Sequence, residues 1–135
     1  MSKTYLLDTN HLGAALRRVS LVRDRIQQAY FQGHRFGTCV PVLCELEIGL
    51  QQTKDARAYR QRLKRLGRFV RLWPLEPGLA EIYGRIYLDL KSKGKVLSQV
   101  DLLIAAMAHL RKFTLLTTDQ DFAALREVRT ENWIV

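Results

Sequence analysis

Short apolar runs alternate with longer amphipathic segments along the chain. The apolar runs predict buried strands at 3–7, 36–40, 69–73 and 114–117, with a further strand near 128–135. Because strands and helices alternate, we expect a three-layer α/β/α fold in which helices cover both faces of a mostly parallel sheet. No repeat, linker or low-complexity tract interrupts the pattern, so the chain is predicted to form a single domain.

Helical periodicity fills the intervals between these runs. We expect helices at roughly 9–17, 20–32, 41–52, 54–68, 77–94, 99–112 and 121–126. Pro41 and Pro77 suit the first turns of their helices, Gly94 suits a position just after a helix end, and Ser98 is a predicted N-cap. The segment 102–108 is apolar on every face, which predicts a central, buried helix.

Two acidic residues follow predicted strands. Asp8 comes directly after the first apolar run, and Asp119 comes shortly after the run 114–117. The carboxyl ends of parallel strands meet at one sheet edge, where α/β folds bind their ligands. Each residue also fits an N-cap. Thr118 and Asp121 form a capping-box pattern, so Asp121 is expected to be structural.

Two further acids lie in apolar helical segments. Glu45 has mostly apolar neighbours at helical spacing, and a carboxylate there is costly unless it is paired, bound to a metal or able to reach water. Glu47 competes with it, because spacing alone barely separates the two residues. Asp101 begins the buried helix and also fits a capping box with Ser98, so it is expected to point into the protein or into a cleft.

Four carboxylates can therefore meet at one edge of the sheet, namely those of Asp8, Glu45, Asp101 and Asp119. One pair of like charges about 4 Å apart costs about 4 kcal/mol at an effective dielectric near 20. Such a cluster persists if it is protonated or if it holds cations. Oxygen ligands without Cys or His favour Mg²⁺ or Mn²⁺, and these ions support phosphodiester hydrolysis.

The charge balance points to a polyanionic partner. The chain has 22 basic and 13 acidic residues, a net charge of +9 and an isoelectric point near 10.0. Much of this charge lies on one face of the predicted helix 54–68, whose opposite stripe is apolar, and more lies close to Asp8. This basic surface is expected either to contact the phosphates of a nucleic acid or to be an ordinary solvated helix face. The candidate residues for contacts with a nucleic acid, RNA included, are Arg17, Arg18, Arg57, Arg60, Lys64 and Arg68.

Several functional classes are excluded or disfavoured. The sequence has no P-loop, dinucleotide-binding glycine motif or nucleophile elbow. Cys39 and Cys44 lie among apolar residues without histidines at zinc spacing, so buried, reduced thiols are expected. The three histidines form no metal motif and are expected at the surface or half-buried. The N-terminus does not read as a signal peptide and no apolar run is long enough to span a membrane, which predicts a cytoplasmic protein.

Four ordered motifs make the chain similar to a known family. Residues 5–10 (YLLDTN), 45–49 (ELEIG), 101–106 (DLLIAA) and 115–122 (LLTTDQDF) resemble the successive motifs of PIN-domain nucleases. Their order and spacing are similar to those of the VapC-type toxins of bacterial toxin–antitoxin pairs. Trp133 in a terminal strand also fits, so the resemblance extends over nearly the whole chain.

The resemblance implies a Mg²⁺- or Mn²⁺-dependent endoribonuclease with a PIN-like fold. It assigns the acidic site to Asp8, Glu45, Asp101 and Asp119. It prefers Glu45 over Glu47, and it implies that Asn10 and Thr117 support the metal ligands. Pro41 departs from the pattern, since many relatives have Ser or Thr at that position.

The resemblance also implies partners. It predicts an RNA substrate, a cognate antitoxin protein that blocks the site or docks near the basic helix, and a homodimer. Three alternatives stay open: a non-catalytic RNA-binding module, a DNA- or flap-directed nuclease of the same fold, and a small-molecule phosphatase. The binding module would bind RNA regardless of chelators, and the DNA-directed nuclease would prefer DNA flaps to RNA. The phosphatase would hydrolyse phosphomonoesters and leave RNA intact.

Overall fold

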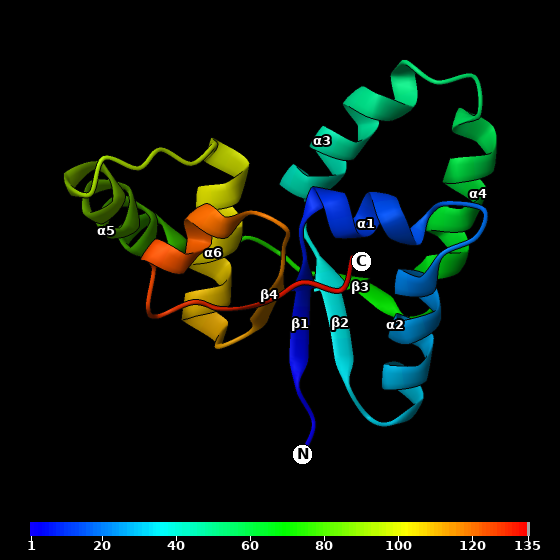
Figure 1. The fold of residues 1–135 in the computed structure, drawn as a ribbon, viewed down its shortest axis with the longest axis horizontal. Helices are drawn as coiled ribbons and strands as arrows, with labels where there is room; N and C mark the ends of the chain where they lie inside the picture. The colour runs from blue at the N-terminus through cyan, green and yellow to red at the C-terminus, as the bar shows by residue number, and fades with distance from the viewer. Residues whose placement is uncertain (135) are drawn as a thin grey trace.

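A parallel sheet forms the centre of the molecule, as seen in a computed structural model that describes residues 1–134 (Figure 1). Its strands are β1 (Thr4–Leu7), β2 (Arg35–Thr38), β3 (Val70–Leu72), β4 (Thr114–Leu116) and β5 (Arg129–Glu131). They run in the order β3-β2-β1-β4-β5, and every neighbouring pair is parallel. The predicted parallel sheet is confirmed, with β1 in its middle.

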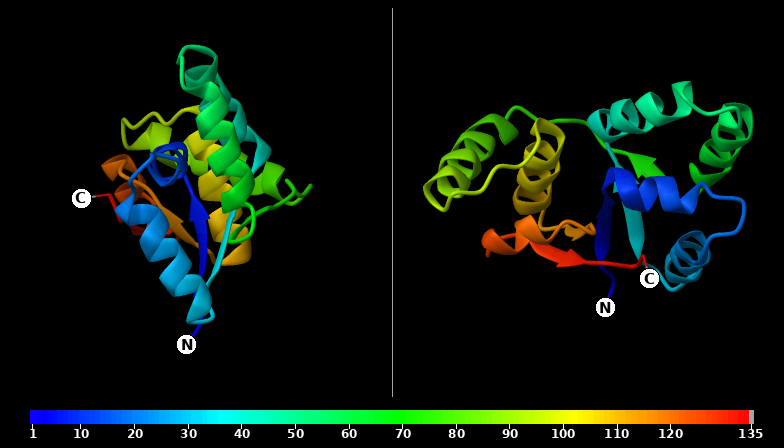
Figure 2. Two further views of the ribbon diagram at one scale, coloured as in Figure 1. Left: turned by 90° about the vertical axis from the view of Figure 1, so that its right-hand side faces the viewer. Right: turned by 45° about the horizontal axis from the view of Figure 1, so that its top comes forward.

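Helices cover both faces of this sheet. They are α1 (Thr9–Ala15), α2 (Leu21–Phe31), α3 (Val40–Gln51), α4 (Ala56–Leu66), α5 (Leu79–Ser92), α6 (Gln99–Arg111) and the 3₁₀ helix η1 (Gln120–Ala124). Figure 1 shows α5 and α6 on one side of the sheet and α1, α2 and α4 on the other, and the right panel of Figure 2 shows the same separation. The predicted three layers are confirmed. No helix within residues 1–134 is long and apolar enough to cross a membrane.

The core is built around β1 and α6. Leu6 and Leu7 of β1 and Leu115 of β4 are fully buried, because helices exclude water from both faces of the parallel sheet. Most side chains of α6 between Leu102 and Ala108 are also buried, as the apolar sequence predicts. This packing holds the carboxyl end of β1 and the first turn of α6 in fixed positions.

Some predicted element ends differ from the observed ones. The second strand ends at Thr38 rather than at residue 40, because Val40 and Pro41 already form the first turn of α3. Pro77 does not open its helix. It lies with Gly78 in a turn, and α5 begins at Leu79.

The C-terminal elements are also shorter than expected. The helix predicted at 121–126 is the 3₁₀ helix η1, and the last strand ends at Glu131. Trp133 therefore lies beyond the strand, and the prediction that it belongs to the strand is wrong. Its ring packs instead against Tyr5, with ring centroids 5.0 Å apart. Position 135 of the predicted strand lies outside the described residues.

Gly37 in β2 occupies a position where the structure has no room for a side chain. A Cβ atom there would overlap the indole of Trp73, which stacks on Phe113 with ring centroids 4.5 Å apart. We expect Gly37→Ala to lower the free energy of unfolding by about 1–3 kcal/mol, because overpacking displaces the indole. Urea denaturation followed by circular dichroism measures this change. Gly84→Ala, at an open position of α5, is the control and is expected to be neutral or stabilising.

Candidate active site

Asp8 follows β1 directly and is the N-cap of α1. Its Oδ1 atom accepts a hydrogen bond of 2.7 Å from the backbone N–H of His11, so the predicted cap is confirmed. The backbone N–H of Asp8 donates to the carbonyl of Leu116 at 3.1 Å. The carboxylate is therefore held at the sheet edge where β1 and β4 end, and its cap bond leaves Oδ2 available for another ligand.

His11 is part of this site, although no sequence motif indicates it. It is fully buried, so its predicted place at or near the surface is wrong. Its Nε2 atom accepts a hydrogen bond of 3.0 Å from the backbone N–H of Trp133, which leaves the ring proton on Nδ1. Nδ1 lies 3.0 Å from Oδ1 of Asp8 and donates to it. The imidazole thus joins the C-terminal segment to the Asp8 carboxylate.

The structure separates Glu45 from Glu47. The half-buried Glu45 accepts a hydrogen bond of 2.5 Å from the hydroxyl of Thr9, the first residue of α1. Glu47 instead forms an ion pair of 2.5 Å with Arg60. The hydrogen bond from Arg60 holds the pKa of Glu47 below its usual value. Glu45 is therefore the member of the pair that lies beside the end of β1.

Asp101 lies half-buried in the first turn of α6. Its backbone N–H donates to the hydroxyl of Ser98 at 3.1 Å, which confirms Ser98 as the N-cap. Burial raises the pKa of the Asp101 carboxyl, and a hydrogen bond with Ser98 lowers it. The negative charges of Asp119, Glu45 and Asp8 raise this pKa further. The other three predicted acids therefore lie within electrostatic reach of Asp101.

Asp119 follows β4 and caps η1. Its Oδ1 atom accepts a hydrogen bond of 2.8 Å from the backbone N–H of Asp121. The predicted cap at Thr118 is wrong, because η1 starts later and the Thr118 hydroxyl accepts a hydrogen bond of 3.0 Å from Asn10. The buried Thr117 hydroxyl accepts one of 3.1 Å from the backbone N–H of Asp119. Asn10 and Thr117 thus brace the two segments that follow β1 and β4.

The chemistry of this group suits a hard divalent cation. Within residues 1–134, no Lys or Arg forms an ion pair with any of the four acids, although the chain has 22 basic residues. In the same part of the chain, no three Asp, Glu, His or Cys side chains are grouped closely enough to hold a metal ion. The fit therefore rests on the donor set, which consists of oxygen ligands that Mg²⁺ and Mn²⁺ prefer.

The basic residues predicted on the helix 54–68 are at the surface. Arg57, Arg60, Lys64 and Arg68 are all exposed on α4 or just after it. Arg60 is already bound to Glu47, so it has less capacity to bind a further anion. Arg57 and Lys64 carry their charge outward on the same helix.

Other predicted basic residues lie closer to the acids. Arg17 lines a groove of about 360 Å³ between α1 and α3, and Asn10 and Glu45 line the same groove. Arg18 and Arg68 line a hollow of about 370 Å³ near the far end of α1. The structure thus divides the predicted basic face into two parts, and only one of them borders the acidic site.

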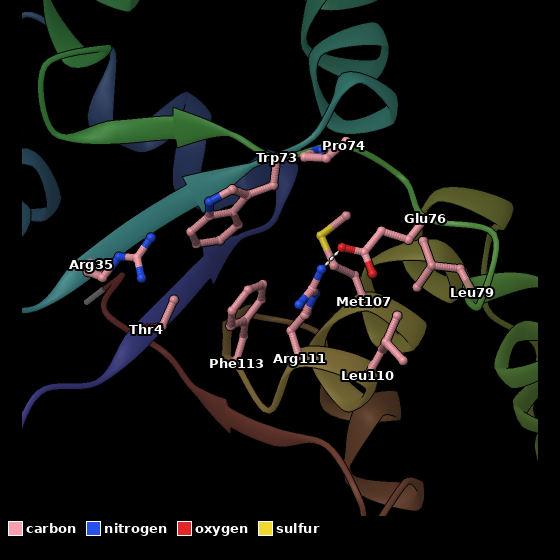
Figure 3. A pocket seen from close by; sticks show the side chains of 10 residues that line it. All are labelled: Thr4, Arg35, Trp73, Pro74, Glu76, Leu79, Met107, Leu110, Arg111 and Phe113. Atoms are coloured by element: carbon pink, nitrogen blue, oxygen red, sulfur yellow. Dashed lines mark ion pairs between the residues drawn. The ribbon is translucent and has the colours of Figure 1, made fainter.

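A further hollow of about 440 Å³ lies away from the acids (Figure 3). Its lining includes the stacked rings of Trp73 and Phe113 and the ion pair between Arg111 and Glu76. None of the four acids lines it. The candidate active site is therefore the group of carboxylates at the sheet edge, not this hollow.

The two cysteines are free thiols and differ in burial. Cys39 is buried, as expected, and burial raises the pKa of its thiol, which keeps it protonated and unreactive. Cys44 is exposed, so its predicted burial is wrong. It lies two residues from the buried Val42 and Leu46 along α3, which places it on the opposite side of the helix.

Nearly the whole chain matches one protein family. The family model described as PIN domain matches residues 5–128. The chain belongs to the PIN domain family. This PIN domain is 33% identical over 93 residues to Ribonuclease VapC5 of Mycobacterium tuberculosis, a match that covers 67% of this chain and 69% of that protein.

Solved structures share the fold of this PIN domain. VapBC2 of Rickettsia felis, bound to a DNA fragment from its promoter, matches with a TM-score of 0.85 and 23% identity, over 97% of this chain and 99% of that chain. VapBC-5 of Mycobacterium tuberculosis, a member of the VapBC family of toxin–antitoxin systems, matches with a TM-score of 0.68 and 23% identity, over 96% and 98%. At these identities the likeness establishes the fold alone.

Proposed function

We propose that this PIN domain is a Mg²⁺- or Mn²⁺-dependent endoribonuclease that hydrolyses phosphodiester bonds of RNA. The observation that carries the proposal is the group of four carboxylates at the carboxyl edge of the sheet. They have no Lys or Arg partner within residues 1–134, and three of them raise the pKa of the fourth. The ribonuclease with which the chain shares 33% identity supports RNA as the substrate.

The four acids have distinct roles in this proposal. Asp8, Asp101 and Asp119 would hold the metal, and Glu45 would either join them or orient the attacking water. A bound Mg²⁺ or Mn²⁺ lowers the pKa of water and neutralises charge on phosphate oxygens. In the proposed reaction, water attacks phosphorus in line while the bond between phosphorus and the 3′ oxygen breaks. This leaves a 5′-phosphate end and, once the departing oxygen takes up a proton, a 3′-hydroxyl end.

The surrounding side chains keep these acids in one orientation. Thr9 holds Glu45 through its hydroxyl, and His11 holds Asp8 through Nδ1. Asn10 and Thr117 brace the segments after β1 and β4. Carboxylates that are fixed before the substrate arrives lose little freedom during the reaction.

We also infer the partners and the location of this PIN domain. The VapBC complexes that share its fold support a cognate antitoxin protein, which would cover the acidic site or dock near α4. A homodimer and a cytoplasmic location belong to the same proposal. These parts of the proposal require a second protein or a cell for their test, whereas the nuclease activity does not.

Incubation of the purified protein with total cellular RNA tests the activity directly. Discrete fragments are expected with Mg²⁺ or Mn²⁺, and none are expected with EDTA. A parallel reaction with flap DNA distinguishes a DNA-directed nuclease. RNA that stays intact with folded, metal-loaded protein would refute the proposal. RNA binding that is the same with and without EDTA, in the absence of cleavage, would favour a non-catalytic module.

A further inference from the structure

A groove between α1 and α3 leads away from the candidate active site. This α1–α3 groove has a volume of about 360 Å³. Asn10 and Glu45 line it beside the acidic site, and Arg17, just after α1, and Tyr59 of α4 also line it. The groove therefore joins the acidic site to a basic and aromatic region of the surface.

A second hollow lies near the end of α1 and is strongly basic. This arginine hollow has a volume of about 370 Å³, and no acidic side chain lines it. Two of its arginines fix its shape: Arg23 donates to the carbonyl of Ala15 at 2.8 Å, and Arg62 donates to that of Leu16 at 3.0 Å. The remaining guanidinium groups are exposed. The basic lining consists of Arg18, Arg23, Arg62, Arg65 and Arg68.

The α1–α3 groove and the arginine hollow adjoin each other. Arg17 lines the groove, and Arg18, the next residue, lines the hollow. Arg62 of the hollow lies over the ring of Tyr59 of the groove, 5.4 Å from its centroid. Because α1 has 7 residues, it is about 10 Å long, so the adjoining groove and hollow, together called the track, extend about this far or farther from the acids.

Two glycines keep the groove open. Gly13 of α1 and Gly49 of α3 both line it. A Cβ atom added at either position would meet nothing within 4 Å, so neither glycine is required by packing. Glycine inside a helix lowers stability by about 0.5–1 kcal/mol relative to Ala. Gly13 and Gly49 therefore leave the groove wide at a cost in helix stability.

We propose that the α1–α3 groove and the arginine hollow together bind the backbone of single-stranded RNA on one side of the cleaved bond. A basic groove with aromatic side chains is the combination that binds single strands, because the phosphates meet positive charge and the bases stack on the rings. Tyr59 and Phe69 supply the rings.

This inference rests on the proposed function, so its test measures binding without cleavage. The probe is a fluorescein-labelled single-stranded RNA oligonucleotide in EDTA, and the readout is fluorescence anisotropy. Gly49→Leu is expected to weaken binding about 10-fold, because its side chain would occupy the groove. Gly84→Leu is the matched control, since Gly84 is an equally open helical glycine of α5 that lines neither feature. Equal binding by Gly49→Leu and the wild type would overturn the proposal.

The arginine hollow has its own variants. Arg65→Ala/Arg68→Ala is expected to weaken binding about 10-fold and to reduce the slope of log affinity against log salt by about 1.4, or about 0.7 for each lost phosphate contact. Arg126→Ala/Arg129→Ala removes the same charge from exposed positions elsewhere and is expected to leave the slope unchanged. If the two double variants lose RNA affinity equally, the arginine hollow is not a specific binding surface and the proposal is refuted.

Two further results are decisive. If Arg65→Ala/Arg68→Ala retains RNA binding but loses binding of poly-L-glutamate, the hollow serves an acidic protein and the proposal is wrong. If RNA binds along the track and no cleavage occurs with metal, the proposed nuclease function fails while this binding surface stands. Thermal unfolding of each variant establishes that it is folded.

Discussion

The Asp101→Asn variant is expected to cleave RNA about 10²–10³-fold more slowly than the wild type, a loss typical of removing one preorganised electrostatic group. The other three acids raise the pKa of the Asp101 carboxyl, so Asp101 lies within electrostatic reach of all three. Single-turnover cleavage with saturating Mg²⁺ measures the effect. Asp121→Asn is the control, because Asp121 lies nearby but pairs with Lys95 at 3.7 Å. Similar losses in both variants would contradict the assignment.

The same substitution is expected to stabilise the metal-free protein. Burial and like charges raise the pKa of Asp101 in the folded state above its unfolded value of about 3.9. The charged form of Asp101 therefore lowers the free energy of unfolding. This destabilisation is absent below the unfolded pKa, and it grows as the pH rises through the folded pKa. Thermal unfolding in EDTA should give Asp101→Asn a higher Tm than the wild type at neutral pH, and the gap should narrow toward about pH 4. A lower Tm at neutral pH would mean that the acids do not repel one another.

Replacing His11 with Ala is expected to lower the affinity for Mn²⁺ by about 10–100-fold, the usual effect of removing a hydrogen bond that orients a metal ligand. The His11 ring donates to Oδ1 of Asp8 and accepts from Trp133, so the substitution removes one of the two hydrogen bonds that hold the carboxylate and leaves the backbone cap in place. Mn²⁺ titration followed by electron paramagnetic resonance measures the affinity directly. His109→Ala, in the last turn of α6, is the control.

A double-mutant cycle separates positioning from a general loss of stability. If His11 acts through Asp8, adding His11→Ala to Asp8→Asn should weaken Mn²⁺ binding little further. Strictly additive losses would mean that His11 does not act through Asp8. All measurements are made well below the Tm of each variant, because a fully buried side chain leaves a cavity when it is truncated.

Local pattern was sufficient to locate three of the acids near the sheet edge. Asp8 and Asp119 each follow an apolar run, and Asp101 begins an apolar helix, so their places depend on neighbours in the sequence. The sequence pattern does not distinguish Glu45 from Glu47, because both lie on the same helix and their neighbours at helical spacing are similar. The contacts that distinguish them come from other elements, Thr9 of α1 and Arg60 of α4.

His11 was missed for the same physical reason. Its second partner is the backbone N–H of Trp133, 122 residues away, and a backbone donor has no sequence signature. The spacing of three residues from Asp8 was the available signal, since it places both side chains on one face of the first helical turn. The arginine hollow also joins residues from separate elements, and the periodicity of a single helix does not contain that information.

The order of the strands in the sheet has a consequence for biosynthesis. The central strand β1 (Thr4–Leu7) is translated before its neighbour β4 (Thr114–Leu116) and the cap residue Asp119, and the helices α1 to α6 and the strands β2 and β3 lie between β1 and β4 in the sequence. A growing polypeptide thus carries Asp8 long before the acids that would complete the site have left the ribosome. Because such non-local pairing also folds slowly, we expect the carboxylate site to assemble only after β4 has been translated, and not while the shorter nascent chain is next to the ribosomal RNA.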